Sequence, residues 1–139
     1  MAKKKQKHHF GTYLMLDLYE CDHAAVGSLE VCYSYLDSLS EILGTSKLAP
    51  PFIIYTDEKK YPDKAGLSGW IAFFNKKTKT FSGASIHTLT PTNFISIDIY
   101  AGDNSLNVRR VRNFTKQIFK PKKIEEHSLK RGRDYREKG

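Results

Sequence analysis

Hydrophobic and polar residues repeat along the chain with two different periods, and these periods predict its secondary structure. Between residues 29 and 43, leucines and one cysteine recur at steps of three and four, which is typical of an amphipathic helix. Ser28 is a suitable cap for the start of this helix, and Gly44 is suited to end it. Residues 95–100 alternate isoleucine with polar side chains, which predicts a half-buried strand.

The pattern predicts six strands and two helices in the order β-α-β-β-β-β-α-β. The other strands are expected at residues 10–17, 52–55, 67–74, 81–89 and 122–128, and Asp103 or Ser105 is expected to cap the second helix. The polar residues between the third and fourth strands are typical of a hairpin tip. Because hairpins join antiparallel strands, we expect an α+β two-layer sandwich, with a mainly antiparallel sheet and two helices on one face.

Length and composition indicate one globular domain. The chain has 139 residues, of which 40% are hydrophobic and 12% aromatic. No apolar run reaches the roughly 20 residues that span a bilayer, and no apolar segment follows the first lysines, so a cytoplasmic protein without membrane contact is expected. The two cysteines, Cys21 and Cys32, form neither a disulfide framework nor a metal-site spacing, and no metal is expected.

The net charge of +8 is concentrated at the ends of the chain. Four lysines precede residue 8, residues 109–139 carry a net charge of +8, and the stretch between them is mildly acidic. We therefore divide the chain into a basic tail (1–8), a folded domain (9–132) and a second basic tail (133–139). Such tails can bind nucleic acid through phosphates, but no recognition motif accompanies the charge, so nucleic acid is not an expected partner.

One stretch suggests chemistry: residues 82–88 read Ser-Gly-Ala-Ser-Ile-His-Thr and follow a Gly-Leu-Ser-Gly turn at 66–69. In this order the two segments resemble the self-cleaving core of the prokaryotic S-adenosylmethionine decarboxylases. Residues 10–21, ending in Leu-Asp-Leu-Tyr-Glu-Cys, are similar to the family's first strand, and Lys-Arg-Gly at 130–132 is similar to its final basic-glycine signature.

The resemblance implies a self-made pyruvoyl cofactor derived from Ser82 after cleavage of the Phe81–Ser82 bond. His87 and Ser68 match the histidine and serine that assist processing, and Tyr61 matches an aromatic residue that stacks on the substrate's adenine. The implied protein is a zymogen and homodimer that decarboxylates S-adenosylmethionine or a related amino compound in the biosynthesis of spermidine and other polyamines. The ketone of a pyruvoyl group withdraws electrons as carbon dioxide leaves.

Four positions depart from the family pattern. Phe81 stands where a glutamate is usual, Gly83 where a histidine is usual, and Pro91 where an acid would hold the ribose. Gly102 stands where the family has a proton-donating cysteine. These departures support a second hypothesis, a paralogue that does not cleave itself and serves as a ligand-binding or regulatory subunit.

Strand geometry sets a condition on the self-cleaving hypothesis. Ser82 and His87 are five residues apart, so on a regular strand their side chains point to opposite faces. They converge only if Ser82 lies in the hairpin or if Gly83 bends the strand. Purely structural roles also stay open: Ser82 as a turn residue, and His87 as an ordinary hydrogen-bonded strand histidine.

Overall fold

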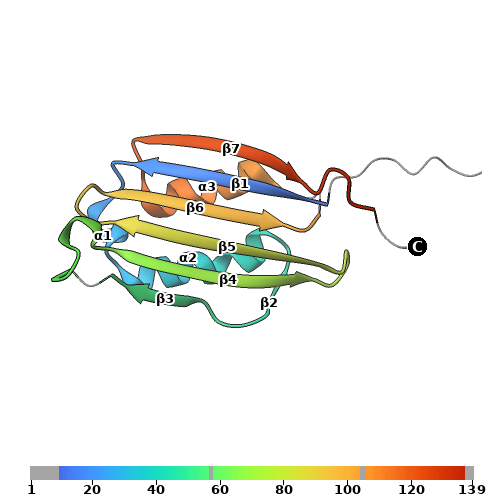
Figure 1. Ribbon diagram of the computed structural model, residues 1–139, viewed down its shortest axis with the longest axis horizontal. Coiled ribbons are helices and arrows are strands. Elements are labelled where there is room, and N and C mark those ends of the chain that lie inside the picture. Colours follow the sequence, from blue (N-terminus) through green and yellow to red (C-terminus); the bar gives the residue numbers. More distant parts are fainter. Residues whose placement is uncertain (1–9, 57, 104–105, 137–139) are drawn as a thin grey trace, which may run out of the picture.

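A single antiparallel sheet forms the body of the molecule. The computed structural model describes residues 10–56, 58–103 and 106–136. The sheet has seven strands in the order β2-β4-β5-β6-β1-β7, and β3 also pairs with β4 (Figure 1). The strands are β1 (Gly11–Tyr19), β2 (Ser46–Lys47), β3 (Phe52–Tyr55), β4 (Leu67–Asn75), β5 (Thr80–Leu89), β6 (Phe94–Ala101) and β7 (Lys123–Arg131).

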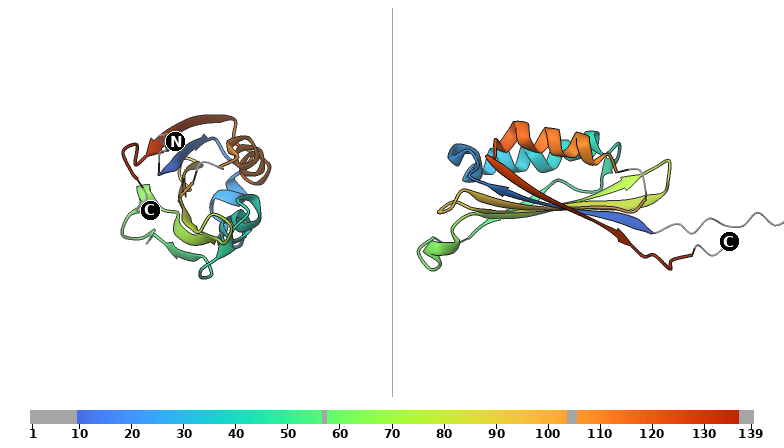
Figure 2. Two further views of the ribbon diagram at one scale, coloured as in Figure 1. Left: turned by 90° about the vertical axis from the view of Figure 1, so that its right-hand side faces the viewer. Right: turned by 90° about the horizontal axis from the view of Figure 1, so that it is seen from above.

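The helices cover one face of this sheet and leave the other face open. They are α1 (His23–Val26), α2 (Leu29–Ile42) and α3 (Val108–Phe119), and a short 3-10 turn, η1 (Pro62–Lys64), precedes β4. Seen from above, α2 and α3 lie side by side on the same side of the sheet (Figure 2). The predicted α+β two-layer sandwich is therefore confirmed. None of the helices in the described ranges is long and apolar enough to cross a bilayer.

The predicted elements are all present, with additions and one wrong cap. The sequence pattern missed β2, α1 and η1, and β7 extends beyond the predicted strand. Ser28 caps α2 as expected, since its Oγ accepts a hydrogen bond from the Val31 amide at 3.1 Å. The prediction that Asp103 caps the second helix is wrong, because Asn107 Oδ1 accepts from the Arg110 amide instead. Ser105, the other predicted cap, and the predicted tail at 1–8 lie outside the described residues.

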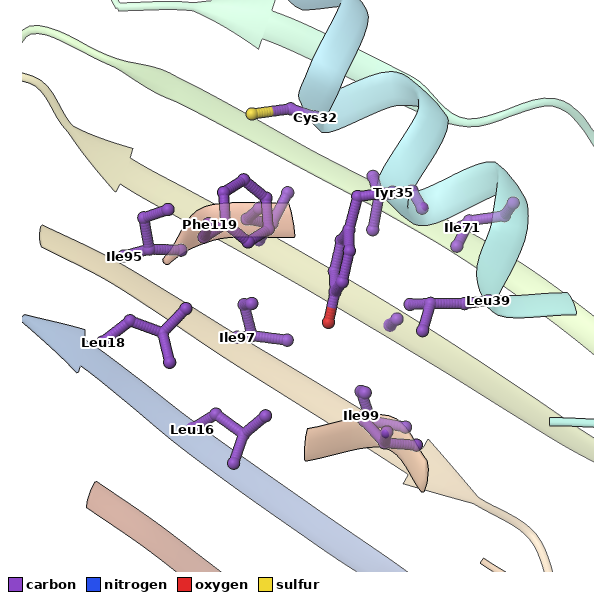
Figure 3. Packing of buried hydrophobic residues seen from close by; sticks show 14 of the residues in the cluster. Leu16, Leu18, Cys32, Tyr35, Leu39, Ile71, Ile95, Ile97, Ile99 and Phe119 are labelled. Carbon is purple, nitrogen blue, oxygen red and sulfur yellow. The ribbon is translucent and has the colours of Figure 1, made fainter. Parts of the chain in front are cut away.

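The core lies between the sheet and the helices. Leucines of β1 and isoleucines of β6 point toward α2 and α3, where Tyr35 and Phe119 pack against them (Figure 3). The phenol of Tyr35 shares a 2.7 Å hydrogen bond with the Thr115 hydroxyl, which also donates to the Val111 carbonyl at 2.8 Å. This bond ties α2 to α3 and satisfies the polar atoms that the core buries.

Candidate functional site on the open face of the sheet

The side chains of β5 alternate strictly between the two faces of the sheet. Ser82, Ala84, Ile86 and Thr88 are buried on the helix side, whereas His87 is exposed on the open face. β5 pairs with β4 over residues 80–87 and with β6 over residues 82–89, and neither ladder is interrupted. None of these residues has a positive φ, so the strand is regular where the resemblance implies cleavage.

His87 and Ser68, the two residues to which the resemblance assigns a role in processing, lie side by side on the open face. They are directly opposite in the register of β4 and β5, and His87 Nδ1 lies 2.9 Å from Ser68 Oγ. Gly66 allows this approach, because a Cβ at that position would lie 1.8 Å from the Thr88 carbonyl oxygen. The Thr88 hydroxyl also accepts from the Leu67 amide at 3.0 Å. The glycine turn thus fixes the register that places the serine beside the imidazole.

Ser82 does not join this pair. Its side chain is only 7% exposed, and its Cα partners are Phe73 on β4 and Ala101 on β6. Five residues along a strand span about 16 Å, and the two side chains leave opposite faces. Ser82 and His87 could converge only if Ser82 lay in the hairpin or if Gly83 bent the strand. Neither holds in the uncut chain, since Ser82 is within the ladder and Gly83 pairs regularly with Ala72 and Tyr100.

A small cavity of about 30 Å³ lies against Ser82 on the helix side. A cavity of this volume has room for about one water molecule. Its lining is part apolar and part polar: Ile42, Leu43, Thr45, Asn75, Ser82, Ala101, Asp103, Leu106 and Asn107. The serine hydroxyl therefore faces the junction of α2, the start of α3 and the β4–β5 hairpin, away from the open face.

Gly102 packs directly against the bond that the resemblance marks for cleavage. A Cβ on Gly102 would lie 2.4 Å from the carbonyl oxygen of Phe81 and 3.3 Å from its amide nitrogen. Contacts under 3.0 Å require backbone movement, so this backbone has no room for a cysteine at position 102. The Phe81 side chain is exposed on the open face, where its ring lies 5.1 Å from that of Phe74.

Tyr61 lies in the loop between β3 and β4, just before η1. Its ring is 52% exposed, and the ammonium of Lys60 lies 5.5 Å from the ring centre. The loop is at the end of the sheet where β4 begins and β5 ends, which is also the end nearest Ser68 and His87 (Figure 1). In the described ranges, neither a hydrogen bond nor a ring contact joins Tyr61 to Ser68, Ser82 or His87.

The open face carries further polar groups that the motif comparison missed. Ser85 of β5 lies opposite Asp98 of β6, and Tyr13 of β1 lies opposite Tyr100. Burial, together with the Asp98 charge and its hydrogen bond, raises the pKa of Tyr13, and burial raises the pKa of Tyr100. The sequence signal for this group is its alternation with the buried isoleucines and leucines of the same strands.

These hydroxyl, imidazole and carboxylate groups occupy the middle of the open face, flanked by the exposed rings of Trp70 and Phe52. Such a surface can bind a polar molecule and hold or transfer a proton. The two thiols contribute nothing to it, since both are buried. Burial raises the pKa of Cys21 to about 11 and that of Cys32 to about 12, so both stay protonated near neutral pH.

Comparison with known proteins agrees with this fold and with the family that the sequence resembles. No curated protein sequence matches the chain. The solved structures that resemble it include the crystal structure of the adenosylmethionine decarboxylase from Aquifex aeolicus VF5, with a TM-score of 0.72 and 18% sequence identity. The match covers 90% of this chain and 92% of that chain. The family model described as S-adenosylmethionine decarboxylase matches residues 12–132. The chain therefore belongs to the S-adenosylmethionine decarboxylase family, the decarboxylases of polyamine biosynthesis.

Proposed function

We propose that this chain is a self-processing decarboxylase that cleaves itself between Phe81 and Ser82 and acts on S-adenosylmethionine or a related amino compound. The observation that supports it is the 2.9 Å contact between His87 and Ser68 on the open face, at the two positions that match the family's processing residues. A pyruvoyl group at residue 82 would supply the ketone that withdraws electrons during decarboxylation.

The other residues fit this proposal in part. His87 and Ser68 are in hydrogen-bond contact, so the imidazole can hold the serine proton or give one up. Ser85, Asp98 and Tyr13 provide polar contacts for a substrate beside them. Ser82 meets the processing pair only after its hydroxyl leaves the helix side of the sheet. Gly83 lowers the barrier to this local rearrangement, because glycine tolerates backbone conformations that other residues avoid.

The intact mass of the purified protein tests the proposal. We expect two fragments, residues 1–81 and 82–139, the second starting with a blocked N-terminus. Ser82→Ala should stay uncut, and His87→Ala or Ser68→Ala should slow cleavage by about 100-fold, the usual worth of a positioned acid or base. Ser128→Ala is the control, since it removes an exposed hydroxyl from β7, away from β4 and β5, and should cleave like the unaltered chain. A single uncut species from the unaltered chain overturns self-processing.

The position of Ser82 favours a second candidate function, that of a family member that stays uncut and binds a ligand as a regulatory subunit. In this case the buried serine, the regular strand and Gly102 are permanent features, and the polar open face is a binding surface. The proposed partners are a small molecule and a second copy of the chain, in a homodimer.

Titration calorimetry tests whether the uncut chain binds a ligand, as this second function requires. We expect the uncut chain to bind S-adenosylmethionine with measurable heat, and Asp98→Asn to weaken the affinity by about tenfold if the carboxylate contacts the ligand's positive charge. Asp37→Asn, on α2 and away from the open face, is the control and should leave the affinity unchanged. Absence of heat and of any shift in thermal unfolding contradicts the binding function.

Substitution of Gly102 tests whether the strand could accept the family's cysteine. Because a Cβ there would approach the Phe81 carbonyl to 2.4 Å, Gly102→Ala and Gly102→Cys should each lower the free energy of unfolding by about 1–3 kcal/mol. Gly27→Ala is the control, since its nearest new contact would be an ordinary 3.4 Å from Thr90. Urea denaturation measures all three variants. Gly102→Cys with unchanged stability would show that the chain around Phe81 adapts easily.

A further inference from the structure

The two long helices carry charges of opposite sign: the charged residues of α2 are all acidic, and those of α3 are all basic. α2 carries Glu30, Asp37 and Glu41 and no basic residue. α3 carries Arg109, Arg110, Arg112 and Lys116 and no acidic residue. The two helices lie side by side (Figure 2), so one side of this layer is acidic and the other basic.

Four basic residues follow one side of α3 and its end. Arg109, Arg112 and Lys116 are spaced by three and four residues, which keeps them within one quarter of the helix circumference, and Lys120 follows as the C-cap residue. Their Cα atoms span about 16 Å at 1.5 Å per residue. Arg112 marks the direction of this basic stripe, because its guanidinium contacts Glu126 of β7 at 2.6 and 2.9 Å. The stripe thus runs along the α3 side that faces the β7 edge of the sheet.

An open cleft of about 370 Å³ lies between the stripe and β7. Its walls come from the second half of α3 and the start of β7: Arg112, Lys116, Pro121, Lys122, Lys123, Ile124 and Glu126. Glu126 is the one acidic residue in this lining, and it is already paired with Arg112. Glu125, the other acid of β7, accepts a hydrogen bond from Tyr19. The cleft therefore keeps a positive excess from Lys116, Lys122 and Lys123.

We propose that the basic stripe and cleft of α3 and β7 bind the phosphate backbone of a nucleic acid duplex without reading its sequence. A stripe of about 16 Å matches roughly five base-pair steps of 3.4 Å along the duplex axis. Cations on one helix side contact phosphates and carry no base information. The acids of α2 repel the same backbone and confine it to the α3 side.

The structure favours this partner over a membrane and over a second copy of the chain. The apolar side of α3, with Val111 and Phe119, is buried against the sheet, whereas interfacial helices insert their apolar side into lipid. Among residues 106–124, no large hydrophobic side chain is exposed. In a second copy of the chain, the acidic residues of α2 would be the partner of the basic stripe. They match it less well than phosphates do, because Asp37 is already bound by Lys47 at 2.6 Å.

Fluorescence anisotropy with a labelled 20-base-pair DNA duplex and the full chain tests this inference. The triple variant Arg109→Gln, Lys116→Gln and Lys122→Gln should bind at least tenfold more weakly than the unaltered chain at 100 mM salt. Its slope of log K against log salt should be shallower by about 2–3 units. The control Lys64→Gln, Lys76→Gln and Lys77→Gln removes the same charge from exposed positions elsewhere, and its affinity should stay within about twofold.

Three results would overturn the inference. Equal loss of affinity in both triple variants would assign the binding to net charge alone. Unchanged affinity in the α3 variant would place the binding elsewhere on the chain. Binding to phosphatidylserine vesicles with no binding to the duplex would identify a lipid surface as the partner. Thermal unfolding of both variants checks that they fold, and none of these outcomes depends on whether the chain cleaves itself.

Discussion

The strict two-residue alternation of β5 determines which of its side chains enter the core and which reach the open face. Pairing on both sides fixes the strand, and its buried residues belong to the core beneath α2. A slip by one residue would expose Ile86 and bury His87, which removes about 2 kcal/mol of burial energy for the isoleucine alone. The core therefore holds Ser82 on the helix side and His87 on the open face at the same time.

Because of this alternation, self-cleavage would require Ser82 to move toward His87 and Ser68. The imidazole and the Ser68 hydroxyl are already in contact, so this half of the proposed processing site needs no movement. Ser82 is near the hairpin end of β5, where fewer pairings must be broken than in the strand centre. A rearrangement limited to residues 81–83 would leave Ile86 in the core. If that segment stays in the ladder, the chain keeps the family fold without cleaving itself, as the second proposed function requires.

Helices and strands were predictable wherever the hydrophobic residues repeat with a clear helical or strand period. Site residues were predictable where two strands of the same hairpin bring them opposite each other. The pairing of Ser68 with His87 follows from the β4–β5 hairpin, and the odd spacing from Ser82 to His87 already indicated opposite faces. The contact between Asp98 and Tyr13 was not predictable, because it depends on pairing between the distant strands β1 and β6. The α3 cap was mistaken because several good capping residues precede that helix within five positions.

Methyl NOEs from the Ser82→Ala protein show on which face of the sheet the side chain of residue 82 lies, because the substitution places a methyl probe there and prevents cleavage. We expect contacts from the methyl group introduced at position 82 to methyl groups of Leu43 and Leu106, which line the same small cavity on the helix side. Contacts from that methyl to the ring of Tyr100 on the open face, without contacts to the two leucines, would contradict this expectation.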